Sequence, residues 1–299
     1  MSEYRYEYAF PVPLPGDRET VYRALTDGQA LRCWFAEHVE VEARPGGLYR
    51  FWGKHTLDGA EAGHANQRIT RMNSGRELAF SWRLLGAETE VTWLLDDGEE
   101  PGTSMVTVRH LFDALPSTGR AEAMIDDLWR IHTGQLCMYL HGNEICRPDF
   151  SGDEAEVRCE ITIEASPESV FAALITPEHI SQWFPAPAPV VEPFVGGRYG
   201  FGFSYVQDGQ TIEPPPMTIL EFEQDRKLAV TWADWRGDPS VPDQKVTWLL
   251  EDLGGRTRLT LVHEGFARPV DVSDYPFGWQ EFLHKIGNVS KTVEVAATV

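Results

Sequence analysis

The sequence has few cysteines, and no stretch of it is a long hydrophobic run. Four of its 299 residues are cysteine, and none forms a C-x-x-C pair, so the spacing predicts neither a disulfide framework nor a metal site. The first residues contain no basic segment followed by an apolar run, and no stretch approaches the length that spans a bilayer. We therefore expect a cytoplasmic protein with reduced thiols, no metal and no membrane segment.

Positive charge is also scarce. The chain has 26 Lys and Arg against 46 Asp and Glu, a formal net charge of -20. This charge repels phosphate backbones and anionic lipids, and no basic cluster offsets it. Nucleic acid and membrane surfaces are therefore not expected partners. The acidic residues are scattered along the chain, which is typical of a solvated surface.

The chain contains the same pattern twice, about 150 residues apart. Residues 20–35, which end in Trp-Phe, return as residues 169–184 with the same ending. Three more motifs recur in order: Gly46-Gly-Leu-Tyr-Arg-Phe51 as Gly196-Gly-Arg-Tyr-Gly-Phe201, Leu78-Ala-Phe-Ser-Trp82 as Leu228-Ala-Val-Thr-Trp232, and Val91-Thr-Trp-Leu-Leu95 as Val246-Thr-Trp-Leu-Leu250. A repeat of this length closes its own core. The sequence predicts two domains, residues 1–145 and 153–299.

Each copy reads as one strand, two short helices, a series of strands and a long helix. Alternating residues predict strands over 6–12 and 157–164. Asp17 and Ser166 stand where helix N-caps are expected. Hairpin signals separate the later strands: Asp58-Gly59, Asp97-Gly98, Asp208-Gly209 and Gly254-Gly255. Amphipathic stripes then predict the long helices: Ile125, Trp129, His132, Leu136 and Leu140, and Trp279, Phe282, Leu283, Ile286 and Val289. This order indicates an α+β fold with a largely antiparallel sheet.

The motifs in this order resemble a known family. They are the helix ending in Trp-Phe, the Gly-Gly-x-Tyr-x-Phe turn, the Leu-x-x-[ST]-Trp strand, the Thr-x-x-His strand end and the Trp of the last helix. They look like the AHSA1-like branch of the START/Bet v 1 (SRPBCC) superfamily, over nearly the whole chain and twice. The resemblance implies two tandem helix-grip domains, each a curved antiparallel sheet wrapped around a long C-terminal helix, with two short helices. It also implies a cavity between the sheet and the long helix.

Large aromatic side chains alternate onto the inward face of each predicted sheet. Any single ring is more often a core residue than a ligand contact, but the whole set suits an apolar pocket with a few polar anchors. The candidate ligand-binding residues of the first copy are Trp34, Phe51, Trp82, Trp93, His110, Trp129 and His132. Those of the second copy are Trp183, Phe201, Trp232, Trp235, Trp248, His263, Trp279 and Phe282.

Two of these candidates follow from differences between the copies. His132 corresponds to Phe282, so a role for His132 would make the two domains act differently. Trp235 lies in a loop, residues 233–243, that is longer than its counterpart in the first copy. An aromatic tip on such a loop indicates a lid, or equally a ring that lies on the neighbouring surface.

The histidines are the best polar candidates for a function. His110 and His263 share their strand faces with apolar residues and should point inward. A structural histidine bonded to backbone or water remains the commoner case than a catalytic or ligand-binding one. The chain contains no His-Glu-x-x-His, no Gly-x-Ser-x-Gly and no phosphate-binding glycine loop. We therefore predict no catalytic residues and no cofactor.

Three functions remain open. The inward rings favour non-catalytic binding of a small apolar or aromatic molecule. The resemblance implies regulation of an Hsp90-type chaperone ATPase, although the Asn-x-Trp-His-Trp signature of the activators' N-terminal portion is absent. A cyclase-, aromatase- or hydrolase-like enzyme would use the same cavity. Fold does not decide among them, and the sequence does not fix the oligomeric state.

Overall fold

The computed structural model describes residues 5–59, 61, 63, 66–152, 155–202, 204–207, 210–213, 215–238 and 240–293. The chain divides into two compact units. The first is Met1–Ala155 together with Ala267–Phe277, and the second is Glu156–Phe266 together with Gly278–Val299. The predicted turn at Asp208-Gly209 and the predicted ends at residues 1, 153 and 299 lie outside the described residues.

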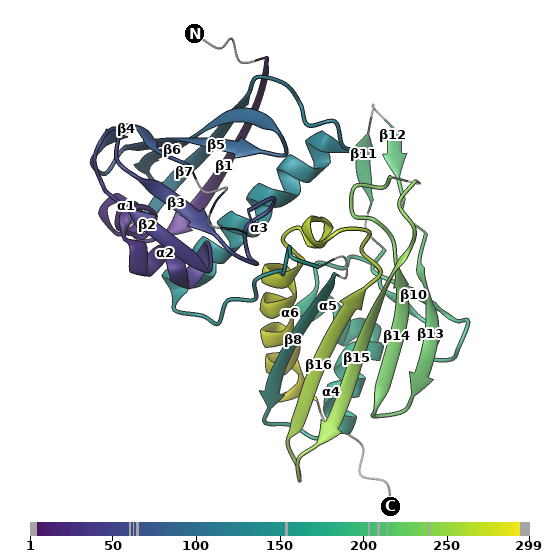
Figure 1. Cartoon of the computed structure of the whole chain (residues 1–299). Coiled ribbons are helices and arrows are strands. Elements are labelled where there is room, and N and C mark those ends of the chain that lie inside the picture. Colours follow the sequence, from purple (N-terminus) through teal and green to yellow (C-terminus); the bar gives the residue numbers. More distant parts are fainter. Residues whose placement is uncertain are drawn as a thin grey trace, which may run out of the picture. The chain divides into compact units, whose positions relative to one another are not determined.

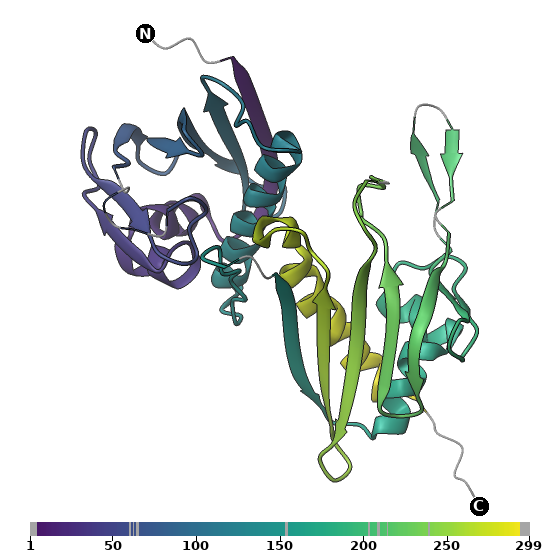
Figure 2. The same ribbon diagram turned by 45° about the vertical axis from the view of Figure 1, so that its right-hand side comes forward.

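In the first unit, a five-stranded antiparallel sheet curves around one long helix (Figures 1 and 2). The sheet order is β1-β7-β6-β5-β4, and β2 pairs with β3 in a separate ladder. Its elements are β1 (Tyr6–Pro15), α1 (Arg18–Thr26), α2 (Gly28–Trp34), β2 (His38–Val41), β3 (Tyr49–Trp52), β4 (Ile69–Asn73), β5 (Glu77–Leu84), β6 (Ala87–Asp97), β7 (Thr103–Phe112), α3 (Ala121–His141) and the 3₁₀ helix η2 (Pro269–Val272).

The second unit repeats this plan with a seven-stranded sheet, ordered β8-β16-β15-β14-β13-β10-β9. The helices α4, α5 and α6 cover one face of this sheet (Figure 2). The elements are β8 (Glu156–Ile163), α4 (Pro167–Ile175), α5 (Pro177–Trp183), β9 (Val190–Val191), β10 (Arg198–Gly200), β11 (Tyr205–Gln207), β12 (Gln210–Ile212), β13 (Met217–Glu223), β14 (Lys227–Trp232), β15 (Gln244–Asp252), β16 (Thr257–Glu264) and α6 (Tyr275–Ser290). The first three residues of α6 are counted with the first unit.

Local sequence signals explain where these elements begin. The predicted N-caps are confirmed, because the Asp17 carboxylate accepts a hydrogen bond from the backbone N–H of Thr20 and the Ser166 hydroxyl accepts one from Ser169. The second glycine of each Gly-Gly turn is required by space. A Cβ at Gly47 would lie 2.2 Å from the carbonyl oxygen of Glu42, and Gly197 is equally confined. The same close turn therefore leads into β3 and β10.

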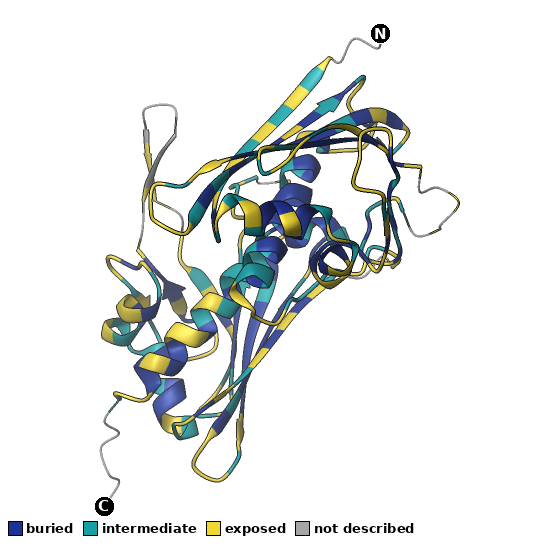
Figure 3. Cartoon of the chain, turned by 90° about the vertical axis from the view of Figure 1, so that its left-hand side faces the viewer, coloured by how far each residue is buried: buried dark blue, intermediate teal, exposed yellow. Residues whose placement is uncertain are grey.

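Both sheets carry an irregularity at the same place. The register shifts between Ile69 and Arg71 in β4 and between Ile219 and Glu221 in β13. Such bulges bend a strand and increase its twist. Along β1, exposed residues alternate with partly buried ones (Figure 3), as the sequence pattern predicts for a strand with one inward face. The α+β helix-grip fold that was expected is confirmed in both units.

The long helices bury the predicted stripe. Ile125, Trp129 and Leu136 of α3 are buried, as are the corresponding apolar residues of α6. Leu140 and Phe282 are only half-buried. A fully buried side chain of this size contributes about 1.5–3 kcal/mol. The stripes therefore hold each long helix against the concave side of its sheet.

Candidate functional site

The seven candidate residues of the first unit lie in one cluster between the sheet and α3. Neighbouring rings pack mostly edge-to-face, with centroids 5 to 7 Å apart, a favourable arrangement for aromatic pairs. The pairs include Trp34 with Trp93 (6.3 Å), Trp93 with Trp129 (5.5 Å), Phe51 with Trp82 (5.2 Å) and Trp82 with His110 (5.7 Å). All seven side chains are buried. This packing fills the space between sheet and helix with the rings themselves.

Polar edges of these rings are paired with the backbone of the first short helix. The indole N–H of Trp34 donates to the carbonyl oxygen of Ala24 at 3.0 Å, and the hydroxyl of Tyr49 donates to that of Leu25 at 2.8 Å. The second unit repeats both bonds on α4. Carbonyl groups at a helix C-terminus lack partners within the helix, so these side chains satisfy them. The Trp of the Trp-Phe pair and the Tyr of the glycine turn thus hold the short helix in place.

His110 lies within a chain of hydrogen bonds. The indole N–H of Trp129 donates to His110 Nδ1 at 3.0 Å, and His110 Nε2 lies 2.8 Å from Thr89 Oγ1. Because Nδ1 accepts, Nε2 must carry the hydrogen of the neutral ring and donate it to Thr89. The Thr89 hydroxyl in turn donates to the carbonyl oxygen of Trp82 at 2.6 Å. Burial lowers the pKa of His110 to about 3, so the ring is neutral at pH 7.

His263 has the same role in the second unit. Trp279 donates its indole N–H to His263 Nδ1 at 3.1 Å, and His263 Nε2 lies 2.7 Å from Gln244 Oε1. Burial lowers the pKa of His263 to about 3 as well. Gln244 and Thr89 occupy equivalent places on β15 and β6. A neutral histidine with both ring nitrogens bonded is thus built into each core, and neither nitrogen is available to a substrate.

His132 differs from the other two buried histidines. Its ring lies 4.6 Å from that of Phe35 and 5.8 Å from that of Trp129. Burial lowers the pKa of His132 to about 3, while the Gln135 side chain acts in the opposite direction. Neither His132 Nδ1 nor Gln135 Oε1 has a partner of hydrogen-bond geometry among the described residues. The first unit therefore contains an incompletely satisfied polar pair in α3.

The seven inward candidates of the second unit also form one cluster, with a different outer layer. The pairs include Trp183 with Phe201 (6.2 Å), Phe201 with Trp232 (6.0 Å), Trp232 with Trp279 (5.0 Å) and Trp248 with Trp279 (6.0 Å). Phe282 lies 4.8 Å from Phe184 and 6.0 Å from Trp279.

Three rings of this cluster are only half-buried: Phe184, Trp232 and Phe282. We call them the aromatic edge. Their counterparts in the first unit, Phe35, Trp82 and His132, are all buried. The aromatic edge is continuous through the rings beneath it, because Phe184 stacks on Phe201 at 3.9 Å and Trp232 contacts Trp279. The two units thus have similar aromatic cores, and they differ in how far the outer rings of the core are buried.

Trp235 lies on the loop between β14 and β15, three residues after Trp232. Its side chain is 44% exposed, and the guanidinium of Arg236 lies 4.0 Å from the ring centroid. Asp234 organises the loop by accepting hydrogen bonds from the backbone N–H groups of Arg236 and Asp238. The loop therefore presents an aromatic tip stacked with a cation.

Sequence reasoning missed four residues of these sites. Phe35 and Phe184 follow the tryptophan of each Trp-Phe pair, and their place beside a recognised candidate was the available signal. Thr89 and Gln244 share the inward strand face with Val91 and Val246, so alternation places them there. Their pairing with histidine depends on the sheet register, which brings Val91 opposite His110 and Val246 opposite His263.

Neither a metal site nor a membrane span is found in the part of the chain that is described. His, Cys, Asp and Glu side chains form no group of three there that would hold a metal ion. Within the same residues, no helix is both long and apolar enough to cross a membrane. Ion pairs are largely confined to partly exposed side chains, such as Arg50 with Glu40 at 2.6 Å, where each pair contributes little to stability.

Solved structures similar to the chain include three of different origin. Protein MLL2253 from Mesorhizobium loti is 26% identical, with 47% of this chain and 99% of that chain covered and a TM-score of 0.37. DynU16, from the dynemicin biosynthetic locus, is 18% identical over 95% of both chains, with a TM-score of 0.40. PFC0360w, an HSP90 activator from Plasmodium falciparum, is 19% identical, with 45% of this chain and 95% of that chain covered and a TM-score of 0.37.

No curated protein matches the chain in sequence. The sequence model of one family, described as Activator of Hsp90 ATPase homolog 1-like protein, matches residues 16–141 and again residues 164–291. The two matches fall one in each sequence repeat and together span most of the chain. The protein is therefore a member of the AHSA1-like family and contains its domain twice in tandem.

Proposed function

We propose that the protein binds a small apolar or aromatic molecule at the aromatic edge of the second unit. The observation that carries this proposal is the half-burial of Phe184, Trp232 and Phe282. The residues at the equivalent positions of the first unit are buried. Large apolar rings that are left partly exposed side by side are typical of a binding site. The ligand would contact the edge and the rings beneath it, without a catalytic step.

The chemistry of the edge favours a flat, uncharged ligand. Its rings meet one another in tilted, stacked and edge-to-face arrangements, the geometries in which a further aromatic ring adds to a cluster. Covering the exposed part of three such rings contributes a few kcal/mol, on the order of millimolar to micromolar affinity. The net negative charge of the chain disfavours an anionic ligand.

Titration of the full chain with N-phenyl-1-naphthylamine, a neutral apolar fluorophore, tests the proposal. We expect saturable binding with one site per chain. Phe282→His gives the second unit the residue that His132 supplies in the first. Loss of the apolar ring, at about 1.5–3 kcal/mol, should weaken probe binding about tenfold or more.

Phe222→His is the matched control. Phe222 is also a half-buried phenylalanine of the second unit, but it lies on β13 against Phe171 at 5.4 Å, outside the aromatic edge. Binding should change less than twofold in this variant. Equal losses in F282H and F222H, or no saturable binding in the parent chain, would refute the proposal.

Regulation of a chaperone ATPase is the second candidate, because the family to which the chain belongs is described by that activity. Stimulation of ATP turnover in a purified Hsp90-type chaperone is its test. An unchanged rate of ATP turnover at a saturating concentration of the protein would exclude this second candidate. An enzymatic function has no comparable support, because His110 and His263 are fully engaged within the cores. We further propose a cytoplasmic location, on the basis of the low cysteine content and the free thiols.

A further inference from the structure

A small cleft lies within the first unit, between α3 and the segment that runs from the turn after η2 to the first residues of α6. Its volume is about 10 Å³. Its walls include Arg130, Gln135, Met138, Ser273, Asp274 and Phe277. Gly134 permits this close approach, because a Cβ there would lie 3.3 Å from the Cβ of Phe277.

Two buried polar atoms at this cleft have no hydrogen-bond partner among the described residues. They are Oε1 of Gln135, a residue 4% exposed, and Oγ of Ser273, a residue 0% exposed. Both side chains line the cleft. Buried polar atoms are nearly always bonded, to protein or to ordered water. Two such atoms at one cleft therefore indicate a shared polar ligand.

The backbone of Ser273 strengthens this inference. Its φ of 48° and ψ of -136° lie in a region that residues other than glycine rarely adopt. Strain of this kind persists where the surroundings hold a residue in place. The backbone N–H of Ser273 donates to the carbonyl oxygen of Val270 at 3.2 Å. The turn thus fixes a hydroxyl-bearing side chain at the cleft in a backbone conformation that favours glycine.

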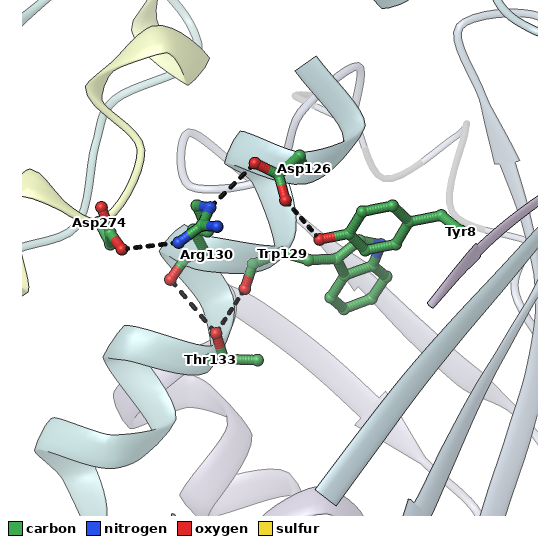
Figure 4. Close-up of polar contacts among 6 residues, drawn as sticks. All are labelled: Tyr8, Asp126, Trp129, Arg130, Thr133 and Asp274. Carbon is green, nitrogen blue, oxygen red and sulfur yellow. Dashed lines mark hydrogen bonds and ion pairs between the residues drawn. The ribbon is translucent and has the colours of Figure 1, made fainter. Parts of the chain in front are cut away.

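The charges around the cleft indicate that the ligand is neutral. Arg130 donates to the carboxylate of Asp126 at 2.9 Å and to that of Asp274 at 3.2 Å (Figure 4). Asp126 also accepts a hydrogen bond from the hydroxyl of Tyr8 at 2.8 Å. The one positive charge of the wall is therefore shared between two carboxylates, which leaves none to hold an anion.

We propose that this cleft binds one water molecule, which donates to Gln135 Oε1 and bonds to Ser273 Oγ. The cavity volume of about 10 Å³ lies at the lower end of the roughly 10–15 Å³ that one water needs. The water would join α3 to the turn at Ser273, within the first unit. It is a structural site, independent of the apolar binding proposed for the second unit.

The sign of the effect of Ser273→Ala distinguishes a bridged hydroxyl from an unpaired one. If water bridges it, the variant loses about 1 kcal/mol of hydrogen bonding. The opening equilibrium constant of the α3 amides, measured by native-state hydrogen exchange of the full chain, should then rise about fivefold. If the hydroxyl is buried without a partner, its removal should lower the opening equilibrium constant or leave it unchanged. Either result would overturn the proposal.

Ser290→Ala is the control, because Ser290 is also buried but its hydroxyl already donates to the carbonyl oxygen of Ile286 at 2.7 Å. It should leave the α3 amides unaffected. In a Gln135→Met background, Ser273→Ala should have a smaller effect, because the two residues share one water. A high-resolution crystal structure should show a solvent peak bonded to both atoms. Direct bonding of Gln135 Oε1 to His132 or to Ser273 would contradict the proposal.

Discussion

Trp129 donates its indole N–H to Nδ1 of His110 across 3.0 Å, and the second unit repeats the bond between Trp279 and His263. Each bond joins the long helix to the strand next to the edge of its sheet, β7 or β16, through two buried side chains. It also fixes the histidine tautomer, because the accepting nitrogen carries no hydrogen. The two histidines that sequence analysis offered as functional groups are thus structural parts of the helix–sheet junction.

Trp129→Phe should destabilise the first unit by about 1–3 kcal/mol, because it leaves His110 Nδ1 buried without a donor. Chemical unfolding monitored by circular dichroism measures the change. Trp52→Phe is the control, since Trp52 is half-buried on β3 and contacts Arg50 and His38 at the surface. A W129F variant no less stable than W52F would show that the bond contributes nothing.

The acid sensitivity of the first unit should depend on His132. Burial lowers its pKa to about 3, against about 6.5 in an unfolded chain. As the pH falls below 6.5, the unfolded chain takes up a proton that the folded chain excludes, so stability is lost by about 1.4 kcal/mol per pH unit until about pH 3. His132→Phe removes this contribution.

The free energy of unfolding of H132F, minus that of the parent chain, should therefore increase as the pH falls from 6.5 to 4. Denaturant titrations at several pH values give the two curves. Parallel curves over this range would show that His132 is protonated equally in the folded and unfolded chain.

The segment after α3 should stabilise the first unit, although its composition resembles that of a linker. Within it, the backbone N–H of Phe150 donates to the carbonyl oxygen of Lys54 at 2.6 Å, and Arg147 donates to that of Arg32 at 3.0 Å. His55 Nδ1 also donates to the carbonyl oxygen of Pro148 at 2.8 Å.

We therefore predict that a chain ending at residue 142 is less stable than one ending at residue 155 by about 0.5–1.5 kcal/mol for each lost bond. Thermal unfolding of the two fragments measures the difference. We still expect each domain to fold alone. Equal midpoints would show that the segment is dispensable, and molten fragments in near-UV circular dichroism would show a shared core.

Trp235 should slow the escape of an apolar ligand from the second unit. Its exposed ring lies on the long loop that follows Trp232, which is the last residue of β14 and a member of the aromatic edge. Trp235→Ala should therefore speed dissociation of N-phenyl-1-naphthylamine from the full chain, measured by stopped-flow dilution, while the circular dichroism spectrum stays unchanged. An unaltered dissociation rate would assign the ring to the loop surface and remove the lid.

Much of the fold follows from local signals in the sequence. The repeat gives two similar units, the caps at Asp17 and Ser166 begin the short helices, and the confined glycines at 47 and 197 fix the turns. The caps and the glycines act within a few residues, so they are recognisable without tertiary context, and the repeat is found by comparing the sequence with itself. The inward positions of Trp82 and Trp232 follow from strand alternation in the same way.

Features that depend on long-range contact were not predictable in this way. The half-burial of Phe282 depends on which rings surround it in space, since His132 at the equivalent helix position is buried. The partners of the histidines depend on sheet register. The turn around Ser273 belongs by contact to the first unit, although it lies in the second sequence repeat. Periodicity carries no information about such placement.

Indole NMR of the full chain tests ligand binding at the aromatic edge most directly. With nitrogen-labelled tryptophan, the indole N–H signals of the chain's ten tryptophans, once assigned by substitution, report on both units at once. Addition of N-phenyl-1-naphthylamine should shift the signals of Trp232 and Trp279 in a saturable manner and leave those of Trp82 and Trp129 in place. Equal shifts in the two units, or none in either, would contradict the proposal that the second unit alone binds an apolar ligand.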